Sequence, residues 1–121
     1  MIENIQASLE IREASPRDIP GILKMVAELA EFEQLSDQLV ATEVDYQESL
    51  FGDHPAAEAL VATVSGELVG YAIFFSTFST FVGRAGLWLE DLYVRPAFRK
   101  AGIGKKLLKS VGAIAEKRAA G

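Results

Sequence analysis

The residues with the clearest chemistry lie in the stretch 99–104, which reads Arg-Lys-Ala-Gly-Ile-Gly. It follows a strand-like run that ends at Arg95 and Pro96, and it precedes a basic amphipathic helix. Glycines let backbone N–H groups approach an anion closely, and the start of a helix adds unpaired donors and a positive dipole end. Arg99, Lys100 and Lys105 add full charges. This stretch is therefore expected to bind phosphate groups.

Two familiar phosphate motifs do not fit this stretch. The dinucleotide fingerprint needs a third Gly or Ala where Leu107 stands. A Walker A loop needs Gly at Arg99 and Ser or Thr at Lys106. What remains is Arg-x-x-Gly-x-Gly between a strand and a basic helix, which is more specific than a lone Gly-x-Gly pair.

Two adjacent carboxylates, Glu90 and Asp91, lie in the strand that leads to this stretch. A carboxylate next to the apolar run Leu-Trp-Leu costs free energy, which favours a functional role for Glu90. Glu90 is therefore the candidate general base. Strict alternation sends neighbouring strand residues to opposite faces, so both acids can line one site only if the strand bulges there. For Asp91, a merely solvated position is an equal alternative.

Three further side chains are weaker candidates. Glu33 continues the apolar stripe of the first helix, with a helix-end acid reaching solvent as the alternative. Trp88 could lie against a cation, although packing in the core is the favoured interpretation. His54 precedes Pro55 and is expected to be structural, and one histidine without any cysteine gives no metal-site spacing.

The elements that must position these residues are expected in the order β-α-α-β-β-β-α. The strand-like runs are 9–12, 59–64, 68–75 and 87–94, with a hairpin at 65–67 and a Ser/Thr/Gly-rich connection at 76–86. Ser15 and Pro16 begin a helix with an apolar stripe, and Thr42 begins a second helix that ends at Gly52. A last helix runs to about residue 118. The sequence thus predicts a mixed α/β fold.

Length and composition indicate a single small domain, residues 1–121, with half of its residues apolar and no cysteine. Residues 1–60 hold thirteen acids and three bases, and residues 61–121 hold four acids and nine bases. This asymmetry favours two ligands of opposite charge, although two solvated faces would give the same pattern. The sequence shows no apolar run of membrane-helix length and no secretory signal, so we expect a cytoplasmic protein.

The pattern Arg99-x-x-Gly102-x-Gly104 resembles the acetyl-CoA motif of the GNAT N-acetyltransferase superfamily. Shorter matches resemble its diamine branch, the spermidine/spermine or thialysine acetyltransferases. They are Ile-Arg-Glu-Ala at 11–14, Glu-Leu-Ala-Glu-Phe-Glu at 28–33, Phe-Gly-Asp-His-Pro at 51–55 and Leu-Glu-Asp-Leu-Tyr-Val at 89–94. The resemblance covers nearly the whole chain, from residue 11 to about residue 118.

The resemblance implies an α/β GNAT fold, a mixed and mostly antiparallel sheet flanked by helices. It implies acetyl-CoA as co-substrate, with the pantetheine arm paired to the backbone of residues 92–94 and the pyrophosphate at residues 100–105. The implied coenzyme-binding residues are Leu92, Tyr93, Val94, Arg99, Lys100, Ala101, Gly102, Ile103, Gly104 and Lys105. The implied substrate-binding residues are Phe32, Glu33, Glu90 and Asp91, and no metal is expected.

The function expected from these features is acetyl transfer from acetyl-CoA to a primary amine of a small cationic substrate, a diamine, a polyamine or a lysine-like amino acid. With no cysteine for an acetyl-enzyme, the amine attacks the thioester directly. Protein N-acetylation and a non-catalytic acyl-CoA-binding module are the alternatives. The branch implies a homodimer, and nucleic-acid binding is poorly supported because the protein is acidic and lacks interleaved aromatics in its basic helix.

GNAT enzymes continue past this helix with further strands, and the diamine branch carries there an Asn-Glu-Pro-like segment and a tyrosine that protonates the leaving thiolate. This chain ends at Gly121, and Tyr46, Tyr71 and Tyr93 do not match that tyrosine. We therefore expect the C-terminal strands to be missing and the activity of residues 1–121 alone to be low. Robust acetylation by this chain would contradict that expectation.

Overall fold

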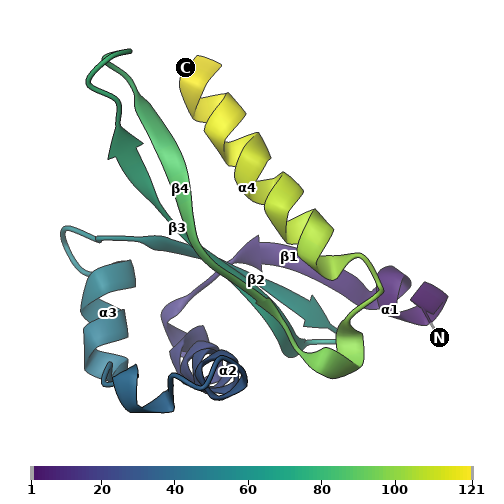
Figure 1. The fold of residues 1–121 in the computed structure, drawn as a ribbon. Helices are drawn as coiled ribbons and strands as arrows, with labels where there is room; N and C mark the ends of the chain where they lie inside the picture. The colour runs from purple at the N-terminus through teal and green to yellow at the C-terminus, as the bar shows by residue number, and fades with distance from the viewer. Residues whose placement is uncertain (1, 121) are drawn as a thin grey trace.

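A computed structural model describes residues 2–120, in which a four-stranded sheet lies between two layers of helices (Figure 1). The strands are β1 (Leu9–Glu13), β2 (Glu58–Val64), β3 (Glu67–Phe78) and β4 (Ala85–Val94). Each strand pairs antiparallel with the next, in the order β1-β2-β3-β4. The predicted α/β architecture, a mostly antiparallel sheet flanked by helices, is confirmed.

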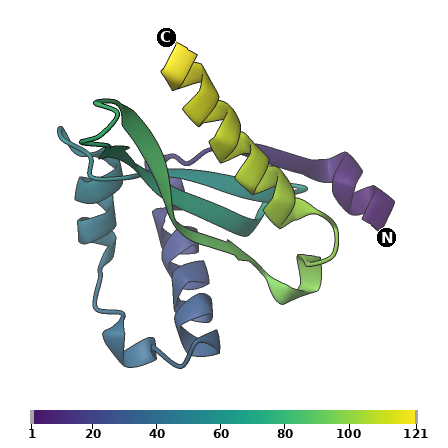
Figure 2. The same cartoon turned by 45° about the horizontal axis from the view of Figure 1, so that its top comes forward.

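The two faces of the sheet are covered by different helices. The helices α2 (Ile19–Phe32) and α3 (Glu43–Phe51) lie on one face, and α4 (Ile103–Ala120) crosses the other, as the turned view also shows (Figure 2). A first helix, α1 (Ile2–Ser8), which the sequence analysis did not predict, lies near the start of α4. None of the helices within residues 2–120 is both long and apolar enough to cross a bilayer.

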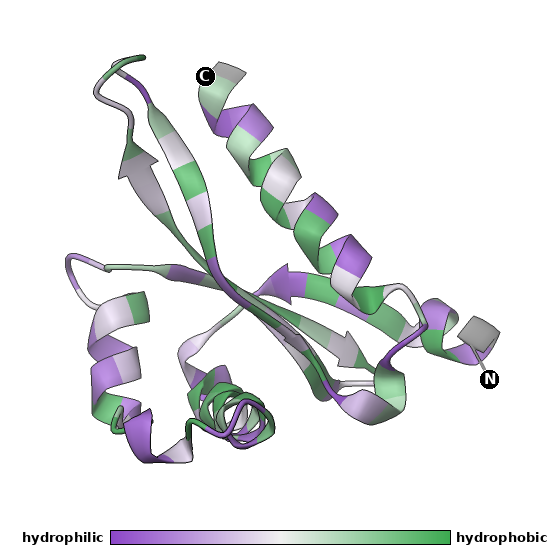
Figure 3. Cartoon of the chain, in the orientation of Figure 1, coloured by the Kyte–Doolittle hydropathy of each residue, from purple (hydrophilic) through white to green (hydrophobic). Residues whose placement is uncertain are grey.

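Two separate clusters of buried side chains hold the layers together. On the α4 side, Ile103 and Leu107 pack against the sheet around Phe74. On the other side, Ile22 and Met25 of α2 pack against Val61, Tyr71 and neighbouring residues. Figure 3 shows the corresponding alternation of hydrophobic and hydrophilic residues along the strands and along α4. Because neighbouring residues of β3 belong to different clusters, one strand serves both cores.

The hairpin between β2 and β3 lies where it was predicted, but its loop has two residues instead of three, because Glu67 already pairs with Val64. Ser65 and Gly66 both have positive φ, 51° and 83°, as a two-residue type I′ turn requires. The predicted connection at 76–86 is wrong in extent, because β3 continues to Phe78 and β4 starts at Ala85. Ser76 and Thr77 pair with Leu87 and Gly86 there. Polar residues that are typical of turns are thus also accommodated at the end of a strand pair.

Asp18 ties the start of α2 to β1. It ends the short 3-10 turn η1 (Pro16–Asp18), is 5% exposed and accepts hydrogen bonds from both Nη1 and Nη2 of Arg12, at 2.7 and 3.0 Å. The Ser15 backbone N–H also donates to its Oδ2 at 2.8 Å. The hydrogen bonds from Arg12 are the main reason that the pKa of Asp18 is lowered from 3.8 to about 2.

We therefore predict that Asp18→Asn lowers the free energy of unfolding by roughly 2–3 kcal/mol at pH 7. Since the folded pKa is depressed, this contribution is present above pH 4 and is lost as the pH falls from about 4 to 2. Urea unfolding of both proteins across that range should show the difference shrinking. A difference that stays constant down to pH 2 would count against the ion pair.

Candidate functional site

The basic stretch forms a tight turn between β4 and α4. The strand ends before the 3-10 turn η3 (Pro96–Phe98), and α4 begins at Ile103. Lys100 and Gly102 both adopt left-handed backbone, with φ of 72° and 79°, on either side of the buried Ala101. The Gln6 side chain of α1 donates to the Ala101 carbonyl at 3.3 Å. The buried Ala101 and its hydrogen bond to Gln6 thus hold the turn in place, while Lys100 and Gly102 are exposed.

A cleft of about 500 Å³ opens between this turn, the end of β4 and the end of α2. Eight of the ten residues expected to bind the coenzyme line it: Leu92, Tyr93, Val94, Arg99, Lys100, Gly102, Ile103 and Gly104. Ala101 lies in the core below the turn, and Lys105 points away on the outer side of α4. The sequence analysis missed Leu29 and Phe98, two lining residues whose apolar side chains resemble ordinary core positions.

The outer edge of β4 turns backbone groups to this cleft, and of these the Val94 carbonyl already accepts from Nε of Arg99 at 2.9 Å. The Arg95 N–H donates to the Val69 carbonyl at 2.8 Å, so the alternating ladder turns the N–H and C=O of Val94, and those of Leu92, to the other edge. Within residues 2–120 no strand pairs with that edge. An extended ligand with amide groups could therefore bind there like an added strand.

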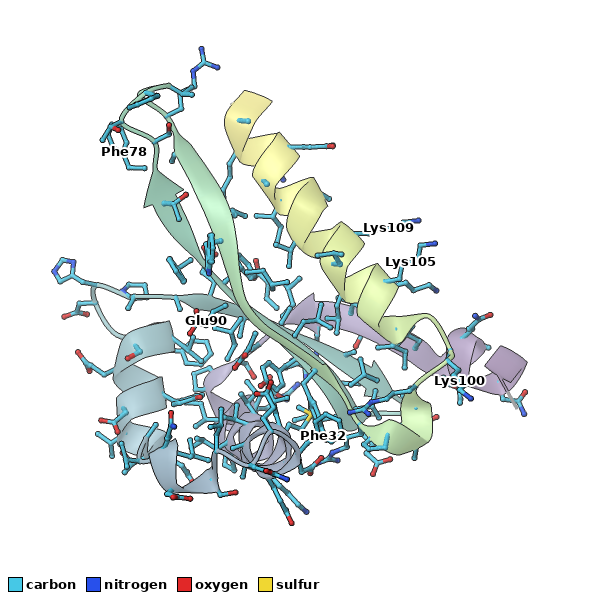
Figure 4. All side chains as sticks on the ribbon, in the orientation of Figure 1. Phe32, Phe78, Glu90, Lys100, Lys105 and Lys109 are labelled. Atoms are coloured by element: carbon cyan, nitrogen blue, oxygen red, sulfur yellow. The ribbon has the colours of Figure 1, made fainter. Side chains whose placement is uncertain are left out.

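Arg99 lies between two aromatic rings in the cleft. Its guanidinium carbon is 5.6 Å from the ring centre of Phe32 and 5.6 Å from that of Tyr93. Its Nε donates to the Val94 carbonyl at 2.9 Å. Figure 4 shows Phe32 at the end of α2, where its ring is 72% exposed. Arg99 therefore lines the cleft, and its other guanidinium N–H groups can donate to a bound anion.

Glu28 connects α2 to the end of β4. Its Oε1 accepts from the Tyr93 hydroxyl at 3.0 Å, and its Oε2 lies 3.1 Å from Nη2 of Arg95. Arg95 in turn donates to the Leu68 carbonyl at 3.0 Å. Because α2 and β4 form opposite walls of the cleft, this network fixes the distance between them.

Removing that carboxylate is expected to loosen the cleft. We predict that Glu28→Ala lowers the free energy of unfolding by about 1–3 kcal/mol, because Tyr93 and Arg95 lose their acceptor. Glu28→Gln keeps one acceptor oxygen and should lose less. Chemical denaturation of the two variants beside the wild type tests this, and equal losses would argue against a role for the acceptor.

The two adjacent acids of β4 sit at a β-bulge. Ile73 pairs with Asp91 but Phe74 pairs with Leu89, so Glu90 is the extra residue on β4. The predicted departure from strict alternation is therefore present. Figure 4 shows Glu90 part-way along β4. A bulge of this kind re-aims side chains and is often found next to active sites.

Asp91 lies on the sheet face that α2 and α3 cover, close to two tyrosines. The Tyr71 hydroxyl donates to its Oδ2 at 3.5 Å. Burial raises the pKa of Asp91, and the carboxylates of Glu90 and Glu33 raise it further. Burial and the charge of Asp91 likewise raise the pKa of Tyr46. Glu33 and Glu90 thus both act electrostatically on Asp91, and these three acids are called the acidic end of the site.

The exposure of three further side chains bears on the sequence expectations. Trp88 is 58% exposed, so the favoured interpretation as a core residue is wrong. Glu33 is exposed at the C-terminal cap of α2, in agreement with the alternative of a helix-end acid that reaches solvent. Its charge nevertheless raises the pKa of Asp91. His54 is exposed in the loop between α3 and β2. Tyr46 and Tyr71 were not singled out, because each reads as an apolar-face residue of its element.

The sequence profile of the Acetyltransferase (GNAT) family matches residues 23–121. The chain belongs to this family. It is 42% identical over 117 residues to a thialysine N-epsilon-acetyltransferase of Sus scrofa, covering 90% of this chain and 68% of the relative. It is 38% identical to a spermidine/spermine N(1)-acetyltransferase-like protein of Homo sapiens, covering 88% of this chain and 16% of that protein. These matches make it an acetyl-CoA-dependent N-acetyltransferase of the GNAT type.

A solved structure supports the same assignment for the fold. The ribosomal-protein-alanine N-acetyltransferase of Brucella melitensis biovar Abortus 2308 matches this GNAT domain with a TM-score of 0.74 and 30% identity. The match covers 92% of this chain and 74% of that one. Within residues 2–120 of the GNAT domain, no group of three or more acidic or histidine side chains is arranged to hold a metal ion.

Proposed function

We propose that the pantetheine arm of acetyl-CoA binds along the free edge of β4, at the backbone of Leu92 and Val94. The pyrophosphate then lies at the turn, where the left-handed backbone of Lys100 and Gly102 exposes N–H groups and Arg99 adds charge. Two observations support this fit: the edge of β4 that no strand pairs with within residues 2–120, and the cleft of about 500 Å³, which Gly104 lines. The thioester end then points along β4 towards the acidic end.

The amine substrate is proposed to bind at the acidic end. Glu33 and Asp91 attract its ammonium groups, and Phe32 at the end of α2 contacts its carbon chain. Glu90 removes the ammonium proton, directly or through water, so that the neutral nitrogen attacks the thioester carbonyl. The nitrogen then loses its second proton, the carbon–sulfur bond breaks and an amide forms, and the thiolate of coenzyme A leaves and takes up that second proton.

A lysine-like amino acid is the preferred substrate of this proposal, with small diamines and polyamines next. The observation that carries it is the acidic end itself, together with the 42% identity to a thialysine acetyltransferase. Acetylation of a protein N-terminus is the second candidate, favoured by the match to a ribosomal-protein-alanine acetyltransferase. A non-catalytic acyl-CoA-binding module is the third, and it would bind the coenzyme without turnover.

A panel of amines distinguishes these candidates. The purified chain with acetyl-CoA is offered thialysine, lysine, a diamine, spermidine and a peptide with N-terminal alanine, and coenzyme A thiol release is measured. The proposal predicts the highest kcat/KM for thialysine or lysine. Faster transfer to the peptide would favour the second candidate, and tight acetyl-CoA binding with no transfer to any amine would favour the third.

We also propose that the protein acts in the cytoplasm as a homodimer and does not bind nucleic acid or membranes. The resemblance to the diamine branch and the acidic overall charge support this proposal. Light scattering of the purified chain at several concentrations tests the oligomeric state.

A further inference from the structure

Tyr71 is a fully buried polar side chain for which the proposed reaction has no use so far. It lies in β3, opposite Tyr93 of β4, on the face of the sheet that α2 and α3 cover (Figure 1). Its ring packs in one cluster with Ile22 and Met25 of α2. Because a ring in a closely packed core has little freedom to move, the Tyr71 hydroxyl is held at a fixed place.

The Tyr71 hydroxyl is directed at Asp91. Ile73 is the residue of β3 opposite Asp91, and Tyr71 comes two residues earlier, so Tyr71 and Asp91 are diagonal neighbours on one face. The hydroxyl donates to Oδ2 of Asp91 at 3.5 Å. Burial raises the pKa of Tyr71, and the charge of Asp91 raises it further, so the hydroxyl keeps its proton. Hydrogen bonds in unliganded active sites are often long and shorten in the complex.

The other titratable groups around Asp91 do not stabilise its charge. After burial, the carboxylates of Glu90 in β4 and Glu33 at the end of α2 are the causes that raise the pKa of Asp91. Tyr46 of α3 is close enough for the charge of Asp91 to raise its pKa as well. No ion pair between described residues includes Asp91. The hydrogen bond from Tyr71 is the contact that lowers the pKa of Asp91 and offsets this repulsion.

We propose that Tyr71 is a positioning residue, whose hydroxyl holds the Asp91 carboxylate in the orientation that receives an ammonium group of the amine. This inference rests on the proposed function, in which Asp91 attracts the cationic substrate. An ionised carboxylate accepts several hydrogen bonds at once, so Oδ1 stays available to the ammonium group while Tyr71 donates to Oδ2. Tyr71 itself is buried and acts on the substrate only through Asp91.

Tyr71→Phe removes the hydroxyl and keeps the ring that fills the core. Calorimetric titration of the chain, saturated with coenzyme A, with lysine and with spermidine should show about tenfold weaker amine binding at pH 7. The affinity for coenzyme A should not change. The amine binds only to ionised Asp91, and loss of the hydrogen bond raises the pKa of that carboxyl. Amine binding should therefore fail at a higher pH in the variant than in the wild type.

Two further variants separate this role from a general effect on the fold. Thr63→Val removes another buried hydroxyl, in β2, and should keep the wild-type affinity and pH profile. In an Asp91→Asn background, Tyr71→Phe should weaken amine binding no further, because the carboxylate on which it acts is gone.

Several results would overturn the role of Tyr71. They are a Tyr71→Phe variant with the amine affinity and pH profile of the wild type, an equal loss of affinity for coenzyme A, the same loss in the Asp91→Asn background, or a variant that circular dichroism shows to be unfolded. A folded wild type that binds coenzyme A but no amine at any pH would instead overturn the proposed function, and this inference with it.

Discussion

Replacing Gly104 by leucine is expected to weaken acetyl-CoA binding by about 100-fold while the chain stays folded. A Cβ at this position would lie 3.5 Å from Leu92 Cδ2 and 3.7 Å from Val94 Cγ2, which is ordinary contact. The rest of the leucine side chain must enter the cleft, where the coenzyme is proposed to bind. In a helix, replacing glycine also removes a backbone entropy cost of about 0.5–1 kcal/mol.

Gly112 supplies the matched control on the same helix. Among the described residues, no atom lies within 4 Å of a Cβ added there, and the position is exposed. Gly112→Leu should therefore raise the unfolding temperature and leave binding unchanged. The prediction fails if Gly104→Leu binds acetyl-CoA as tightly as Gly112→Leu does, or if its loss of binding is accompanied by unfolding.

Glu90→Gln is expected to lower the turnover number about 100-fold or more relative to the wild type measured in parallel. Glutamine keeps the shape of the side chain but cannot accept a proton from the ammonium group. Because the side chain is exposed at a bulge, the fold should be unaffected. The KM for acetyl-CoA should change little, since the coenzyme is proposed to bind along the end of β4 and at the turn before α4. Glu67→Gln, an exposed acid at the start of β3, is the control.

The pH profile separates Glu90 from its neighbour as the proton acceptor. In the wild type, burial is the largest cause of the raised pKa of Asp91, and the charge of Glu90 adds to it. Removing that charge lowers the pKa of Asp91, so its ionisation moves to lower pH in Glu90→Gln. If Asp91 were the base, the variant would keep most of its rate and its acidic limb would shift to lower pH. A large loss of rate at every pH supports Glu90.

Local patterns in the sequence were sufficient for much of this site. Glycines between a strand and a helix predicted the tight turn before α4, and Thr42 was predicted to begin α3, where the structure shows a capping box with Asp45. The adjacent acids of β4 required a bulge, which is present at Glu90. Such features depend on residues that are close in the sequence, and for that reason they can be predicted without knowledge of the tertiary structure.

Features that depend on distant contacts could not be read in this way. The helix α1 is short and is held partly by the contact of Gln6 with Ala101, which are 95 residues apart. The stacking of Arg99 between Phe32 and Tyr93 likewise joins α2, β4 and the turn. Gly52 does end α3 as predicted, but its φ of −73° shows that a left-handed cap is not the reason. A Cβ there would collide with the Glu48 carbonyl.

The most direct test of the central claim is a calorimetric titration of the purified chain with acetyl-CoA. The account predicts one binding site per chain with a dissociation constant in the micromolar to millimolar range, as is usual for enzyme substrates, and loss of that site in Gly104→Leu. A wild-type chain that is folded by circular dichroism but shows no binding heat, and no displacement of a fluorescent coenzyme A analogue, would contradict it.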